Sequence, residues 1–351
     1  MKKKLFLLDA YALIYRAHFA FINNPRINSK GLNTSAIFGF CNSLLEVINN
    51  HEPTHLGVVF DPPGGSNREE IFTEYKANRQ EMPEDIRKAI PYIFEILKAM
   101  NIQVEMISGF EADDLIGTLS KQAEKKGYKV FMMTPDKDFG QLVSENIFIY
   151  KPGRSGNPSE ILGPNEVCEK FEVERPEQVI DILGLWGDAV DNIPGIPGIG
   201  EKTAKKLIGK YGSIENLLAN TEDLKGKQKE NVENFAEQGL ISKKLATIIL
   251  DCPVEFNESI YKRKEIDEKP LTDILKELEF NQLGKRILGK PIYQEKQMDL
   301  FASSENESES TTNLQDFSST KPDYKLIQTW EEHLNFINEL SYKDAVAFDT
   351  E

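Results

Sequence analysis

Glu111, Asp113 and Asp114 place three carboxylates within four residues, directly before the apolar run 115–119. An acid-rich first turn that complements a helix dipole is the commonest reason for such a cluster. Acids also follow or flank the other apolar runs of the chain, at Asp9, Asp61, Asp136, Asp138, Asp188 and Asp191. This recurrence favours one shared site over a single helix cap.

The apolar runs before several of these acids are typical of buried strands. If the strands form one parallel sheet, their carboxyl ends meet in a single crevice, which is where open α/β sheets bind ligands. Carboxylates so close together repel one another and resist ionising, unless hard divalent cations neutralise them. The sequence therefore predicts a metal site built from oxygen ligands.

Strand and helix patterns alternate through the first half of the chain. Short apolar runs predict buried strands at 5–8, 56–60, 102–105, 129–133 and 147–150. Apolar residues at helical spacing predict helices from residue 10, at 35–49, at 84–100 and up to residue 126. We therefore predict an α/β fold with a mostly parallel central sheet flanked by helices.

After residue 164 the patterns are helical, and 187–204 lies between two of the predicted helices. Its glycines leave backbone N–H groups open beside a helix start, where phosphate oxygens bind. The helix that follows carries Lys202, Lys205, Lys206 and Lys210. A plain interhelical turn is the alternative, but such a turn seldom combines three glycines, two prolines and a basic helix.

Basic and aromatic residues interleave in the polar segment 68–79. Taken alone, this pattern favours a solvated amphipathic helix. Because the segment lies between acidic motifs, it is also a candidate lid over the site. Its cations would bind phosphates, and Tyr75 would stack on a base.

Composition bounds the kind of protein. The 351 residues carry a net charge of −15, which is not typical of a nucleic-acid binder, but an acidic site can lie beside a basic track. The three cysteines, Cys41, Cys168 and Cys252, are not spaced as metal ligands, so we expect them to lie in the core. Their wide spacing also suits a reducing compartment. We find neither a signal peptide nor a membrane span, and so expect a soluble cytoplasmic protein.

The chain divides into four predicted parts. These are an α/β core over 1–163, a helical subdomain over 164–290, a disordered acidic linker over 291–322 and the start of another folded domain over 323–351. The linker is polar and acidic without periodicity, so it cannot bury a core. The end of the chain, 346–351, is predicted to be a buried strand that stops within a motif.

The motifs, taken together and in order, resemble the flap-endonuclease family, and in particular the 5′-nuclease region of bacterial DNA polymerase I. The resemblance covers about residues 1–290 and rests on Asp9 and the segments 58–61, 75–79, 109–114, 134–138 and 187–204. Residues 348–351 are similar to the first motif of the proofreading 3′–5′ exonuclease domain that follows there.

The resemblance implies a phosphodiesterase with two Mg²⁺ ions, or Mn²⁺ in their place. The implied ligands of the first ion are Asp9, Asp61, Glu111 and Asp113. Those of the second, directly or through water, are Asp114, Asp136, Asp138, Asp188 and Asp191. Lys76 and Arg79 would descend from a helical arch near 68–100 to stabilise charge on the phosphate, and Tyr75 would stack on a threaded nucleotide.

The resemblance also implies a helix-three-turn-helix over about 182–210, which would hold duplex DNA through phosphates and a bound K⁺ ion. The implied contacts are Gly195, Gly198, Gly200, Lys202, Thr203, Lys205 and Lys206. The substrates would be 5′ flaps and nicks in duplex DNA and RNA primer–DNA hybrids, cut during primer removal and repair. The expected enzyme is a monomer of the bacterial cytoplasm, followed by exonuclease and polymerase domains.

Two other functions remain open at this point. In the first, the helical hairpin binds DNA and the acids are structural, but an acidic crevice without counter-charge would cost stability. Loss of cleavage in EDTA, with DNA binding retained, distinguishes the nuclease from this binding module. In the second, the protein is a stand-alone flap nuclease without a polymerase.

Overall fold

The computed structural model describes residues 3–153, 158–292, 327 and 329–340. The chain forms two compact units, Met1–Gln294 and Glu295–Glu351. Within the second unit the described structure includes the helix α15 Trp330–Leu340, in which Trp330, Leu334, Phe336 and Ile337 are exposed. From residue 293 on, the predicted linker lies outside the described residues, as does the strand predicted at 346–351.

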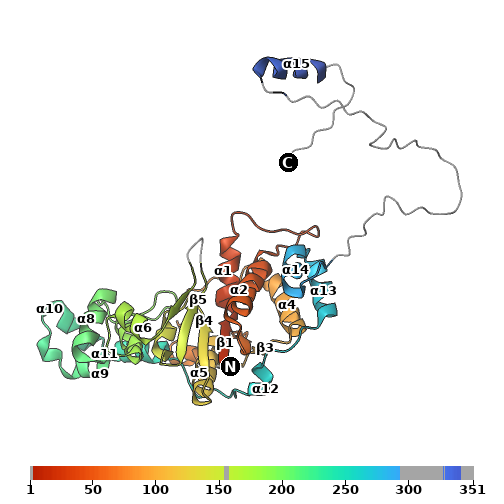
Figure 1. The fold of residues 1–351 in the computed structure, drawn as a ribbon. Helices are drawn as coiled ribbons and strands as arrows, with labels where there is room; N and C mark the ends of the chain where they lie inside the picture. Colours follow the sequence, from red (N-terminus) through yellow and green to blue (C-terminus); the bar gives the residue numbers. More distant parts are fainter. Residues whose placement is uncertain (1–2, 154–157, 293–326, 328, 341–351) are drawn as a thin grey trace. The chain divides into compact units, whose positions relative to one another are not determined.

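A six-stranded sheet in the order β3-β2-β1-β4-β5-β6 forms the centre of the first unit (Figure 1). Its strands are β1 Lys4–Asp9, β2 His55–Val59, β3 Gln103–Glu105, β4 Lys129–Met133, β5 Ile147–Lys151 and β6 Glu160–Leu162. The first five strands pair in parallel, and β6 runs antiparallel to β5. The predicted fold class is confirmed. The short strand β6 was not predicted from the sequence.

The register of the strands brings acids to one edge of the sheet. Asp9 ends β1 beside the last residue of β2, and β4 ends in nearly the same register on the other side. Asp61 and Asp136 follow the ends of β2 and β4 within three residues. Since parallel strands all end at the same edge, these three carboxylates reach one crevice.

Alternate side chains of β1 enter two separate cores. Leu5 and Leu7 belong to one core, whereas Phe6 and Leu8 belong to the other, as the two-residue period of a strand requires. The Phe6 core includes α1 Ala10–Ala20, α2 Ser35–His51, α4 Glu84–Ala99, α13 Glu268–Glu277 and α14 Asn281–Leu288. The Leu5 core includes α5 Ala112–Lys125 and continues into the helical region.

The helical region gathers at one end of the first unit (Figure 1). Its helices are α6 Pro164–Phe171, α7 Val179–Trp186, α8 Glu201–Tyr211, α9 Ile214–Ala219, α10 Gly226–Asn234 and α11 Ala236–Ala246. Short elements join the larger ones, namely α3 Arg68–Ile71, η1 Asp138–Leu142, η2 Pro176–Gln178, η3 Thr221–Asp223 and α12 Glu258–Tyr261. Helix α13, which the sequence assigned to this helical subdomain, packs against α4, and α14 packs against α13, both in the Phe6 core.

The predicted helical arch near 68–100 is absent from the described structure. Helix α3 is a single turn, residues 73–78 form a series of turns, and α4 is a core helix. Ile86, Ile93 and Ile96 of α4 are fully buried. Apolar residues at helical spacing need a surface to pack against. For α4 this surface is provided by α2 and α13 in the Phe6 core.

Cys41 and Cys252 are buried, Cys168 is half-buried, and all three are free thiols. The helices among residues 3–153, 158–292 and 329–340 are all too short or too polar to cross a membrane.

Candidate active site

A cavity of about 880 Å³ lies at the carboxyl edge of the sheet. Nine carboxylates line it, namely Asp9, Asp61, Glu69, Glu81, Glu111, Asp113, Asp136, Asp188 and Asp191. Three cations also line it, namely Lys76, Arg79 and Lys137. Side chains from distant parts of the sequence therefore meet in one place, and most of the predicted metal ligands are among them.

Asp9 and Asp61 are held by the starts of two helices. Asp9 caps α1, since its Oδ1 accepts the N–H of Ala12 at 3.1 Å, while its Oδ2 accepts the hydroxyl of Thr134 at 3.1 Å. Asp61 Oδ1 accepts the N–H of Ala112 at 2.9 Å, at the first residue of α5. Burial and the neighbouring Asp61 raise the pKa of Asp9 to about 7, and burial raises the pKa of Asp61.

Few donors from the protein stabilise the charge of three further carboxylates, namely Asp113, Asp136 and Asp138. Burial raises the pKa of Asp113 well above its usual value, and Asp136 and Asp9 add to the rise. Burial also raises the pKa of Asp136, although the N–H of Asp138 donates to its Oδ1 at 2.9 Å. Asp138 Oδ1 is buried and accepts no hydrogen bond from the described residues, which suits a cation ligand.

Glu111 differs from the other carboxylates because cations surround it. Its Oε2 accepts Lys76 Nζ at 2.6 Å and lies 3.5 Å from Arg68 Nη1, and its Oε1 accepts the hydroxyl of Ser66 at 2.7 Å. Burial opposes ionisation, but Lys76 and Arg68 outweigh it and lower the pKa of Glu111. Lys76 has a left-handed backbone with φ of 55°, an uncommon conformation for lysine that functional sites often hold.

The segment 74–79 is fixed against the turn that carries Asp191. The N–H of Lys76 donates to the carbonyl of Asp191 at 2.9 Å, and Asn78 Nδ2 donates to the carbonyl of Ala189 at 2.7 Å. Arg79 Nη2 donates to Asp191 Oδ1 at 2.6 Å. These contacts join the sheet unit to the helical hairpin across more than 110 residues. The interpretation of this segment as a solvated amphipathic helix is therefore wrong.

Lys137 is a site residue to which sequence reasoning gave no role. Its ammonium donates to Asp188 Oδ2 and lies 5.3 Å from the centre of the Trp186 ring. Its position between Asp136 and Asp138 is the signal that could have identified it. Lys137 neutralises the hairpin end of the cavity, as Lys76 neutralises the end at Glu111.

Asp114 lies outside the cavity, although the sequence grouped it with the second set of ligands. Its side chain is 1% exposed, and both of its oxygens accept from Arg68, at 2.8 and 2.7 Å. It also accepts the N–H of Ile249 at 2.8 Å and that of Glu111 at 3.2 Å. With four donors already bound, Asp114 has little capacity left for a metal ion. It joins the start of α5 to α3 and to the chain after α11.

Tyr75 is also placed differently from the prediction. The residue is 5% exposed and belongs to the Leu5 core. Its hydroxyl donates to Glu111 Oε2 at 3.2 Å. A ring buried in this way does not offer a face to a nucleotide, so Tyr75 supports Glu111 instead of stacking on substrate.

The glycines of the hairpin serve two different purposes. Gly195 has φ of 62°, its N–H donates to Ser242 Oγ at 3.0 Å, and a Cβ there would lie 2.5 Å from the backbone nitrogen of Gly187. Gly195 is therefore required by chain packing, not by phosphate approach. Gly198 has φ of 78° and Gly200 caps α8, and neither N–H donates to a described residue.

The basic residues of α8 divide in a similar way. Lys205 donates to the carbonyl of Lys170 at 2.8 Å and pairs with Glu201 at 2.9 Å. Lys202 and Lys206 are exposed and form no ion pair with the described acids, and Thr203 is half-buried in the first turn. The exposed pair, together with the open amides of the turn, can receive phosphate oxygens.

The donor set of the cavity fits hard divalent cations. Buried carboxylates with raised pKa values are stabilised by such ions, which prefer oxygen ligands. Across the described residues, no group of three or more acidic, His or Cys side chains is arranged to hold an ion by itself. Mg²⁺ commonly takes one or two carboxylates and completes its shell with water and phosphate oxygens, so a spread of acids is compatible with it.

A mostly parallel sheet, an acidic cavity at its carboxyl edge and an adjoining helical hairpin place the chain in a fold that two solved proteins share. The bacteriophage T5 flap endonuclease shares this fold with a TM-score of 0.59 at 23% identity, over 79% of this chain and 100% of that chain. The catalytic core of Rad2 shares it with a TM-score of 0.52 at 18% identity, over 83% of this chain and 90% of that chain.

Family models give the narrower assignment. The 5′-3′ exonuclease N-terminal resolvase-like domain matches residues 4–172, and the 5′-3′ exonuclease C-terminal SAM fold matches residues 174–269. A 5′-3′ exonuclease of Aquifex aeolicus (strain VF5) is 40% identical over 285 residues, which cover 81% of this chain and 95% of that protein. The chain belongs to the 5′-3′ exonuclease family, which confirms the resemblance drawn from the motifs.

Polymerases are also among the relatives. DNA polymerase I of Bacillus subtilis (strain 168) is 40% identical over 288 residues, which cover 82% of this chain and 32% of that protein. The chain thus spans about a third of the length of the polymerases it matches. Relatives therefore include both a stand-alone exonuclease and polymerases that contain a matching region.

Proposed function

We propose that the protein is a divalent-metal-dependent 5′ nuclease that hydrolyses phosphodiester bonds near the 5′ ends of flaps and nicks. The observation that carries this proposal is the cavity where nine carboxylates meet three cations. Metal dependence is further supported by bacteriophage T5 structures, one with divalent metal ions and another with DNA and metal ions.

Two Mg²⁺ ions, or Mn²⁺ in their place, are the proposed cofactors. The side chains proposed for the first ion are Asp9, Asp61, Glu111 and Asp113, and those for the second are Asp136, Asp138, Asp188 and Asp191. Such ions, when bound, lower the pKa of a water nucleophile and polarise the phosphate. Asp114 is not proposed as a ligand, because Arg68 holds both of its oxygens.

Lys76 is proposed to stabilise charge on the transferring phosphate. Burial disfavours its ammonium, but Glu111 and Asp191 outweigh burial and raise its pKa, so it stays protonated at neutral pH. Its side chain is 18% exposed and lines the cavity, whereas that of Arg79 is 50% exposed. Lys76 thus donates to the reacting group, and Arg79 binds a phosphate nearer to solvent.

The turn before α8 is proposed to hold the duplex part of the substrate. The open amides of Gly198 and Gly200, the ammonium groups of Lys202 and Lys206, and a K⁺ ion bound by turn carbonyls would contact phosphates without reading sequence. The substrates would be branched or nicked DNA and RNA primer–DNA hybrids. The proposed setting is primer removal and repair in the cytoplasm, by a monomer that works within or beside a DNA polymerase.

Cleavage of a 5′-labelled double-flap substrate tests the proposal. We expect a single cut near the junction with Mg²⁺ and none in EDTA, while Ca²⁺ supports binding without cleavage. Binding in EDTA with no cleavage under any divalent metal would instead identify a DNA-binding module with structural acids.

A further inference from the structure

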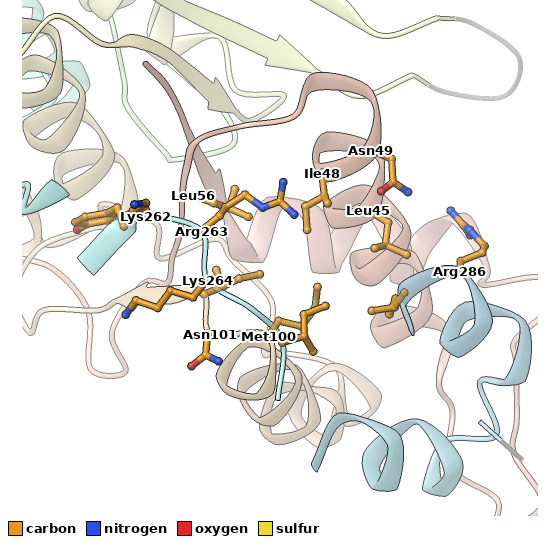
Figure 2. A pocket seen from close by; sticks show the side chains of 14 residues that line it. Leu45, Ile48, Asn49, Leu56, Met100, Asn101, Lys262, Arg263, Lys264 and Arg286 are labelled. Atoms are coloured by element: carbon orange, nitrogen blue, oxygen red, sulfur yellow. The ribbon is translucent and has the colours of Figure 1, made fainter. Parts of the chain in front are cut away.

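A second, smaller pocket lies near the amino ends of the parallel strands, away from the acidic cavity at their carboxyl ends. Figure 2 shows the side chains that line it. It lies beside Leu56, near the start of β2, whereas Asp61 follows the far end of the same strand. The last turns of α2 form one wall and residues 100–102, directly after α4, form another, while residues 261–266 and α14 form the others. Its volume is about 180 Å³.

Cations line this pocket and acids do not. The charged lining residues are Lys262, Arg263, Lys264 and Arg286, in a protein with a net charge of −15. Within the described structure, none of the four forms an ion pair with an acid, although Arg286 Nη1 donates to Asn42 Oδ1 at 2.6 Å. Cations without an acidic partner attract an anion, so the charge of this lining favours an anionic ligand.

The floor of the pocket is apolar and closely packed. Leu45, Leu56 and Met100 are 3%, 2% and 5% exposed, so they form a fixed surface. A cavity of about 150 Å³ admits one benzene ring. The pocket therefore has room for one planar ring and leaves a larger anionic group at its rim.

We propose that this pocket binds a planar ring that carries a phosphate, namely a nucleoside monophosphate. Figure 2 shows Arg263 on one side of Leu45 and Ile48 and Arg286 on the other, so guanidinium groups that bind phosphate oxygens stand on both sides of the apolar floor. The side chain of Asn49, which also lines the pocket, can form hydrogen bonds with a base edge. The proposal is independent of the nuclease function.

The bland alternative is that the long basic side chains simply cover apolar surface with their stems. Calorimetric titration of the metal-free protein in EDTA distinguishes the two. We expect dCMP to bind at one site, and deoxycytidine and inorganic phosphate each to bind at least 10-fold more weakly. Phosphate that binds as tightly as dCMP would overturn the proposal, because the apolar floor would then contribute nothing. So would the absence of dCMP binding.

Single substitutions locate the site. Arg263→Ala and Arg286→Ala should each weaken dCMP binding at least 10-fold, whereas Arg87→Ala, at an exposed arginine of α4, and Lys76→Ala, in the acidic cavity, should not. Thermal unfolding identifies any variant that has lost its fold. Unchanged affinity in both pocket variants would place the nucleotide elsewhere and refute the proposal.

A 5′-phosphorylated dinucleotide distinguishes two sources of the same chemistry. Weaker binding of the dinucleotide than of dCMP would assign the pocket to free nucleotides. Equal or tighter binding would assign it to the phosphorylated end of a strand, and both results support a site for ring and phosphate together.

Discussion

Asp113 and Asp114 are adjacent in sequence, and neutralising them should have opposite effects on the metal-free protein. Asp114→Asn leaves the Arg68 guanidinium, whose side chain is 6% exposed, without the carboxylate that it contacts at 2.8 and 2.7 Å. Removing one partner of a buried ion pair costs about 3–5 kcal/mol, so we expect a loss of unfolding free energy of this size. Asp113→Asn removes a buried charge that Asp136 and Asp9 repel, so stability should stay equal or rise.

Urea unfolding at pH 8 in EDTA measures both changes, with Asp251→Asn, at an exposed aspartate, as the matched control. Cleavage of a flap substrate adds an independent measurement at a temperature where each variant is folded. Asp113→Asn should fold and cut no DNA, whereas folded Asp114→Asn should retain activity. Equal stability losses in the two variants would refute the reasoning, and an inactive Asp114→Asn of parental stability would restore Asp114 as a ligand.

Three further changes test the site. Lys76→Ala should lower the single-turnover rate at least 100-fold, roughly 3 kcal/mol, while duplex affinity in Ca²⁺ stays unchanged. Lys88→Ala is the control. A loss of affinity in proportion to the loss of rate would mean that Lys76 only binds the strand. Gly198→Val should weaken duplex binding in gel-shift titrations. Gly195→Val should unfold the hairpin, because a Cβ at Gly195 would lie 2.5 Å from backbone atoms. Equal thermal stability of the two variants would contradict this difference. Burial raises the pKa of Asp9 from 3.8 to about 7, so the folded state retains a proton that the unfolded chain loses. The unfolding free energy of the metal-free protein should therefore fall as the pH rises from about 4 to about 7. Saturating Mg²⁺ should remove this pH dependence in urea unfolding.

Local sequence patterns were sufficient for the fold class and for most of the acidic cavity. Apolar runs closed by Asp9 and Asp61 are properties of neighbouring residues, and parallel pairing follows from their alternation with helices. The family resemblance rests on the same local motifs. The packing of α13 and α14 in the Phe6 core could not be predicted, because α4, against which α13 packs, lies far away in the sequence.

The sequence by itself determined which acids stand at strand ends and that a glycine-rich turn precedes a basic helix, because both are patterns within a few residues. Only the tertiary structure decided which of these groups face the cavity. Adjacent residues on a helix point about 100° apart, so Asp113 enters the cavity while Asp114 turns to Arg68. The ring of Tyr75 and the N–H of Gly195 are likewise committed to partners that lie far away along the chain. Direction and burial depend on such distant contacts, and no local spacing encodes them.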